Sequence, residues 1–153
     1  MAYIVGPVVV KGNLTDVYTA ADNAVGTRVR DNLNNEFIFL KGVASVVAGT
    51  AVTYDENFAA TRTVTGAKGP VAIAMAAIDA TTKWGWFQIY GKGTGDYAGA
   101  AVLGAKLYSA ATGKVDDAVV AGDQIDNAWV GNTVGGAGAG DVLLNFPSMN
   151  GQG

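Results

Sequence analysis

Short segments in which apolar and polar residues alternate recur along the chain, and glycine-rich turns separate them. Val, Ile, Thr and aromatic residues are concentrated in these segments, which is the pattern of β-strands. The expected strands cover residues 36–40, 43–47, 50–54, 61–65, 71–76, 84–90, 106–109, 115–118, 124–130 and 141–146. The pattern predicts an all-β fold, a compact β-barrel or β-sandwich with an extended N-terminal arm and Gly-rich loops.

Residues 71–76 fit two structures. Alanine favours a helix and Pro70 suits a first helical position, but Val71, Ile73 and Met75 alternate with alanines at period two. The alternation favours a strand with one packing face and one tight face.

The segment 84–90 has two apolar faces. Phe87 and Ile89 point one way, whereas Trp84, Trp86 and Tyr90 point the other. Aromatic side chains each bury roughly 150–250 Å². This strand is therefore expected between two layers, or with Trp84, Trp86 and Tyr90 against a neighbouring subunit.

Proline and glycine mark the expected domain boundaries: an N-terminal arm or edge strand over 1–20, one β domain over 21–147, and a flexible tail over 148–153. Gly6-Pro7 interrupts an apolar run, and proline cannot donate to a sheet ladder, so the run suits an edge or an arm that pairs with another chain. Five glycines make residues 131–140 a predicted mobile loop, and Pro147 is expected to end the last strand. The arm residues expected to touch another chain are Tyr3, Ile4, Val5, Val8 and Val9.

Composition narrows the possible functions. The chain has 153 residues, no cysteine and no histidine, which excludes disulfides, metal sites built on these ligands and the common Ser-His and Cys-His pairs. The net charge of -3 includes no basic stripe, so nucleic-acid binding is not expected. No apolar run predicts a membrane span or a signal peptide, so synthesis and folding in a cytoplasm are expected. Only 15% of residues are charged, against ~25% in a typical domain, which indicates a surface covered by a partner.

One motif suggests a cofactor. Residues 93–98 match the G-x-G-x-x-A dinucleotide fingerprint, and Asp116 follows at the distance of a ribose-binding acid. The helix that this motif requires would contain Gly99 and Gly104, each costing roughly 1 kcal/mol relative to alanine. The glycines of 91–95 are therefore interpreted as turn residues in an extended loop, and no cofactor is expected.

The acidic pairs also lack the pattern of a site. Asp116/Asp117, Asp123/Asp126 and Asp55/Glu56 do not form the ladder of oxygen ligands that calcium requires, so they are interpreted as solvated turn acids. Neither a metal site nor a catalytic residue is predicted.

Two longer runs resemble a known family. GPVAIAMAAIDATTKWGWFQIYGKG and AKLYSAATGKVDDAVVAGDQIDNAWVG, with the closing Gly-Asp-Val-Leu-Leu, resemble the capsid decoration (cement) proteins of tailed bacteriophages over roughly residues 46–146. The resemblance implies a small β-rich protein without catalytic residues that binds the outside of a maturing head, commonly as a trimer, and locks neighbouring capsomers.

The resulting expectation is a structural virion protein on the capsid exterior, made in the host bacterial cytoplasm. Its partners would be the major capsid protein and itself, as a homotrimer, with the arm touching the capsid or an adjacent subunit. The alternative is a carbohydrate- or receptor-binding β module on the phage surface that uses exposed aromatics. A nucleotide-dependent enzyme is the third hypothesis.

Overall fold

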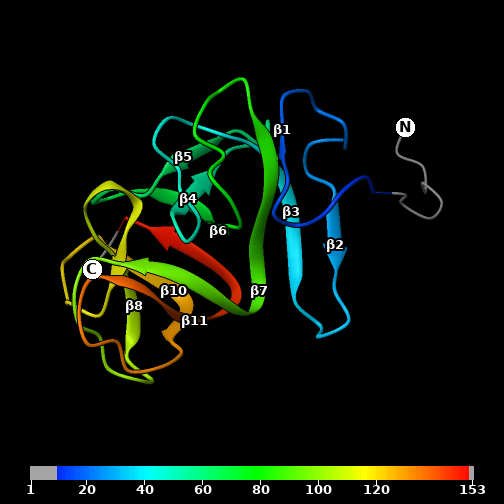
Figure 1. The fold of residues 1–153 in the computed structure, drawn as a ribbon. Helices are drawn as coiled ribbons and strands as arrows, with labels where there is room; N and C mark the ends of the chain where they lie inside the picture. The colour runs from blue at the N-terminus through cyan, green and yellow to red at the C-terminus, as the bar shows by residue number, and fades with distance from the viewer. Residues whose placement is uncertain (1–9, 152–153) are drawn as a thin grey trace.

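The computed structural model describes residues 10–151. Within these residues, eleven strands form one mixed sheet (Figure 1). The prediction of an all-β fold is confirmed; a single 3-10 turn, η1(Ala111–Gly113), interrupts the described strands. The strands are β1(Val17–Tyr18), β2(Arg28–Arg30), β3(Glu36–Lys41), β4(Ala51–Tyr54), β5(Ala60–Arg62), β6(Lys68–Ala74), β7(Trp84–Tyr97), β8(Lys106–Ser109), β9(Val115–Asp116), β10(Gln124–Val130) and β11(Gly138–Asn150).

Part of the sheet closes on itself. The second half of β7 pairs antiparallel with β11, from Tyr97↔Gly138 to Tyr90↔Asn145. From β11 the pairing continues through β10, β8 and β9, and Tyr97↔Val115 returns it to β7. We call this closed part, residues 91–97 of β7 with β8–β11, the ring half. It encloses an aliphatic core that includes Leu107, Ile125 and Val142.

The other part of the sheet stays open. β2, β3, β1 and residues 84–90 of β7 form what we call the open half, and β2 lies at one end of the strand order. β6, β4 and β5 continue the sheet from β11 to its other end and belong to neither half. Figure 1 shows the β2–β3 hairpin standing beside β7, away from the ring. The core here is aromatic. The Phe39 ring lies edge-on to the rings of Tyr18 and Trp86, and the distances between ring centroids are 5.4 Å and 5.1 Å.

The alternation predicted for β6 and β7 is confirmed. In β6, Val71 and Ile73 join the core of the ring half, whereas Ala72 and Ala74 pack in a separate cluster with Phe87 and Ile89 of β7. Trp84 and Trp86 lie on the opposite face of β7, in the aromatic core. Both strands are therefore buried on two sides.

The G-x-G-x-x-A motif lies within β7, so the prediction of an extended loop at residues 91–95 is wrong. The glycines are needed for packing. A Cβ on Gly95 would lie 2.8 Å from Val142 Cγ1 and 3.1 Å from Val115 Cγ2, which is closer than carbon atoms pack. Without a side chain, β7 can pass close to β9 and β11 and close the ring.

The C-terminal predictions are wrong in two places. β11 continues through Pro147 to Asn150, and Ser148, Met149 and Asn150 pair with β6, so these residues are not a flexible tail. A bulge absorbs the proline: Asp126 pairs with Ser148, while Ala128 pairs with Leu144. Residues 131–140 are not an unstructured loop either, because Val134 is buried and bridges Ala101, and β11 begins at Gly138.

One N-terminal prediction also needs correction: residues 43–47 form turns after β3, with Ser45 at φ 65°, and not a strand. Within the arm or edge strand predicted over 1–20, Val17 and Tyr18 form β1, which among the described strands pairs with β7, at Gly85 and Trp84. The predicted contact residues Tyr3, Ile4, Val5, Val8 and Val9 lie outside the described residues.

Candidate functional site

The structure separates the three aromatic residues predicted to form one face of β7. Trp86 is 1% exposed inside the aromatic core, and Trp84 is half-buried beside it. Tyr90 instead stacks on Phe146 of β11, with 5.2 Å between ring centroids. The three rings therefore do not make a continuous surface platform, and their role in a subunit interface stays a prediction.

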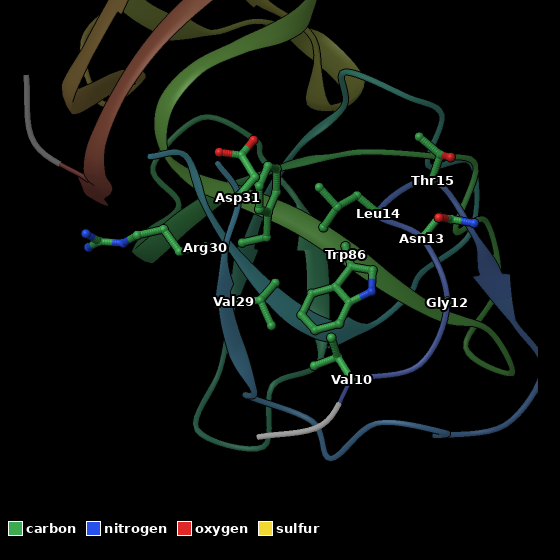
Figure 2. Close-up of a pocket in the computed structure, with 10 residues that line it drawn as sticks. Val10, Gly12, Asn13, Leu14, Thr15, Val29, Arg30, Asp31 and Trp86 are labelled. Carbon is green, nitrogen blue, oxygen red and sulfur yellow. The ribbon is translucent and has the colours of Figure 1, made fainter. Parts of the chain in front are cut away.

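A hollow of about 360 Å³ opens over the aromatic core (Figure 2). Val10, Leu14 and Val29 surround the Trp86 indole, and Arg30 points away from it. A second hollow of about 540 Å³ shares Leu14, Asp31 and Phe37 with the first. We call the two together the N-terminal groove, because residues 10–15 form one of its walls.

Hydrogen bonds hold this wall in place. The Tyr18 hydroxyl donates to the carbonyl of Lys11 at 2.6 Å, and the Lys11 N–H donates to Asn23 Oδ1 at 3.0 Å. The Asn23 side chain is buried, so its hydrogen bonds are shielded from water. Gly12 adopts φ 77° and lies against the Tyr18 hydroxyl, where a Cβ would collide. The backbone at Lys11 and Gly12, next to the first described residue, is therefore fixed.

The charged groups at the rim of the groove are paired within the chain. Glu36 accepts from Arg28 at 2.6 Å and from Arg30 at 3.0 Å. The Asn35 side chain donates to Asp31, and this hydrogen bond lowers the pKa of the Asp31 carboxyl, with further help from the N–H groups of Asn35 and Leu33. The groove thus offers an apolar lining whose neighbouring charges already have partners.

A second feature lies on the outside of the ring half. Trp129 and Leu143 are opposite each other on β10 and β11 and are 37% and 41% exposed. Phe146, at the bulge, is 44% exposed and has φ 50°. The Arg28 guanidinium lies 5.1 Å from the centre of its ring. We call Trp129, Leu143 and Phe146 the outer patch.

Sequence reasoning missed the outer patch. Trp129, Leu143 and Phe146 were assigned to strands, but no role was predicted for them. The signal was present in 141–146: Asp141 and Asn145 mark the solvent side of the strand, and Leu143 falls on that same side. The exposure of Phe146 depends on the bulge, which the sequence pattern did not reveal.

In residues 10–151, no cluster of three or more His, Cys, Asp or Glu side chains is found that could hold a metal ion. Burial raises the pKa of Tyr97 to about 12, and its hydroxyl donates to the carbonyl of Asp141 inside the ring. Burial also raises the pKa of Asp116. Asp123 is buried and accepts from the Thr65 hydroxyl, so its interpretation as a solvated turn acid is wrong.

No protein-family model matches the chain, and no curated protein is found to be similar to it. Across residues 10–151, no helix has the length and apolar character that crossing a membrane requires. The groove and the outer patch are therefore the structural features of the described residues that bear on function.

Proposed function

We propose that this chain is a structural virion protein that binds the outer surface of a bacteriophage capsid and cements adjacent capsid subunits. The observation that carries the proposal is the outer patch: Trp129 and Leu143 are exposed at paired positions on the outside of the closed ring, and Phe146 is exposed at the bulge of β11. The resemblance to decoration proteins supplies the class of partner, the major capsid protein. In this proposal the chain acts as a homotrimer on the capsid exterior, without catalysis or cofactor.

The backbone at Phe146 supports an interaction role. A bulky residue at positive φ is a genuine outlier, and such strain concentrates at functional sites. Bulges re-aim side chains, and this one turns an aromatic ring toward solvent beside Arg28. Exposed aromatic residues with a neighbouring arginine are the usual centre of a protein interface.

Cementing follows from geometry without any reaction. A contact of standard size buries about 800 Å² on each partner. A trimer repeats that contact three times, so modest affinities combine into strong attachment through effective concentration. Because the ring half has no free edge, its outer patch would bind the capsid through side chains, and the shell would gain resistance to internal pressure.

The test is co-sedimentation with heads of the phage that encodes the chain, prepared without this protein. Saturable binding is expected for the wild type. Phe146→Gly should weaken binding at least tenfold while leaving the fold intact, because glycine accepts positive φ and the ring alone is lost. Leu143→Lys should act similarly.

The matched control for the lysine variant is Val119→Lys, because Val119 is 81% exposed and lies in the turn before β10. It should bind heads as the wild type does. The proposal fails if wild-type protein stays in the supernatant, or if Phe146→Gly and Leu143→Lys bind unchanged.

A carbohydrate- or receptor-binding module is the second candidate. A hollow of about 300 Å³ beside Trp129 is lined by Lys106, Gln124, Asp126 and Asn127, which combines a partly exposed ring with hydrogen-bonding groups. A saturable change in tryptophan fluorescence on sugar titration, abolished by Trp129→Ala, would favour this candidate over the capsid role.

A further inference from the structure

We propose that the N-terminal groove receives residues 2–9 of a second copy of this chain, laid in extended form along the edge strand β2. The inference rests on the proposed function, because it names the partner of the N-terminal arm within a decorating oligomer. In this proposal, the open half makes the contacts between copies of the chain, and the outer patch stays available to bind the capsid.

The first observation is where the described chain begins. Val10 lines the groove, and the next residue, Lys11, is held by Tyr18 and Asn23. Nine residues precede Val10. A fully extended segment of that length reaches about 30 Å, which is far enough to enter the same groove on an adjacent copy.

The second observation is chemical fit. Residues 2–9 carry no charged side chain, and five of the eight are Tyr, Ile or Val. The groove presents Leu14, Val29, Phe37 and Trp86. Its charged lining residues already have partners: Arg30 pairs with Glu36, Asp31 with Asn35, and Lys92 with Asp141. An uncharged apolar segment would therefore leave no ionic group without a partner.

The third observation is the sheet edge. Among the described strands, β2 pairs with β3 and with no other, so one side of its backbone has no neighbouring strand. An extended peptide binds such an edge by adding a strand, with alternate side chains entering pockets. Val29 and Arg30 of β2 both line the groove, and of the two Val29 lies toward Trp86. Pro7 is compatible with this role, because proline is tolerated in edge strands.

A second copy fits this occupancy better than the same copy. Residues 10–15 form a wall of the groove, so the segment of the same chain would have to reverse direction next to Val10 to enter it. Val8, Val9 and Val10 are β-branched, and β-branched residues favour extended backbone over tight turns. A segment from a neighbour enters without that reversal.

The first experiment measures the binding of a fluorescently labelled peptide of residues 2–9 to a chain from which residues 2–9 are deleted. Fluorescence anisotropy should show saturable binding. Leu14→Arg in the deleted chain should weaken it at least tenfold, because Leu14 lines both hollows. Leu33→Arg is the matched control: Leu33 is 76% exposed, does not line the groove, and should leave binding unchanged.

The second experiment measures the oligomeric state of the full chain by sedimentation velocity, in the absence of capsids. We expect a concentration-dependent oligomer that is lost on deletion of residues 2–9 and in Val10→Arg, but kept in Val119→Arg. Val10 is 37% exposed, so this variant tests the groove even if Leu14→Arg does not fold.

Absence of peptide binding overturns the inference. So does peptide binding by the deleted chain when the full chain stays monomeric, because the segment would then fill the groove of its own copy. Neither assay contains capsid. A chain that exchanges arms but does not bind heads would refute the proposed function alone, and the reverse result would refute this inference alone.

Discussion

The ring half and the open half of the sheet differ in their strand edges: the first closes on itself, whereas the second ends in an edge strand. In the ring half, β7 pairs with both β9 and β11, and the strands enclose aliphatic side chains. In the open half the sheet ends at β2, and aromatic residues pack under residues 10–18, which include Leu14 and Tyr18. The ring has no edge to offer, whereas the open half keeps one next to a groove.

This difference determines how each half can bind a partner. A closed ring has no free strand edge, so it can interact through side chains that point outward, as the outer patch does. An open edge can also bind through main-chain hydrogen bonds, which select for extended segments. The capsid proposal therefore concerns the ring half, and the proposal of a second copy concerns the open half.

The largest expected effect on stability comes from removing a buried side chain of the aromatic core. Trp86→Ala should reduce the free energy of unfolding by about 3–5 kcal/mol, because a fully buried indole is replaced by a cavity. β7 runs through both halves, so we expect one cooperative urea transition at a lower midpoint.

Trp129→Ala is the matched control for this change, because the same side chain is removed from the surface of the ring half. Its effect should stay within about 0.5 kcal/mol. A two-step unfolding curve for Trp86→Ala would show that the halves unfold independently, which would contradict a single cooperative transition.

A smaller effect is expected from the glycines that allow the ring to close. Gly95→Ala should cost about 1–3 kcal/mol, because the new methyl group would press on Val142 and Val115. Gly99→Ala is the control, since no atom lies within 4 Å of the position its Cβ would take. Thermal unfolding of the two variants measures the difference, and equal stability would contradict the role assigned to Gly95.

The sequence predicted the strands well where period two was unbroken. Phe87 and Ile89 alternate with Trp84 and Trp86 as expected, and both faces are buried. Predictions failed where tertiary pairing overrides a local signal. Gly93 and Gly95 favour a turn by themselves, but here Gly95 gives space to Val115 of β9 and Val142 of β11, which are distant in sequence, and Gly93 gives space to the Gln88 side chain.

The candidate sites were less accessible to sequence reasoning. Pro147 is a strand terminator by local rules, but a bulge opposite β10 accommodates it and exposes Phe146. The groove depends on residues 10–15 crossing in front of β2 and Trp86, and no periodicity encodes that crossing. Both sites arise from contacts between segments that the pattern of each segment does not specify.

The smallest effect concerns two carboxylates, one in each half, whose pKa values shift in opposite directions. In the open half, the hydrogen bond from the Asn35 side chain lowers the pKa of Asp31 below 3.8, so the ionised form favours folding above that pH. In the ring half, burial raises the pKa of Asp116 above 3.8, so the protonated form favours folding, and this stability is lost as pH rises through the folded pKa.

At neutral pH, Asp31→Asn should therefore lower Tm and Asp116→Asn should raise it, each by less than about 2 °C. The Asp31→Asn difference should disappear as pH falls below 3.8 through the lowered pKa of Asp31. As pH falls from neutral, the Asp116→Asn difference should begin to shrink earlier than the Asp31→Asn difference, when pH reaches the raised pKa of Asp116. Thermal unfolding between pH 3 and pH 7 measures both. Hydrogen bonding stabilises the charge of Asp31, whereas burial opposes the charge of Asp116. Changes in Tm of the same sign for the two variants at pH 7 would contradict this difference.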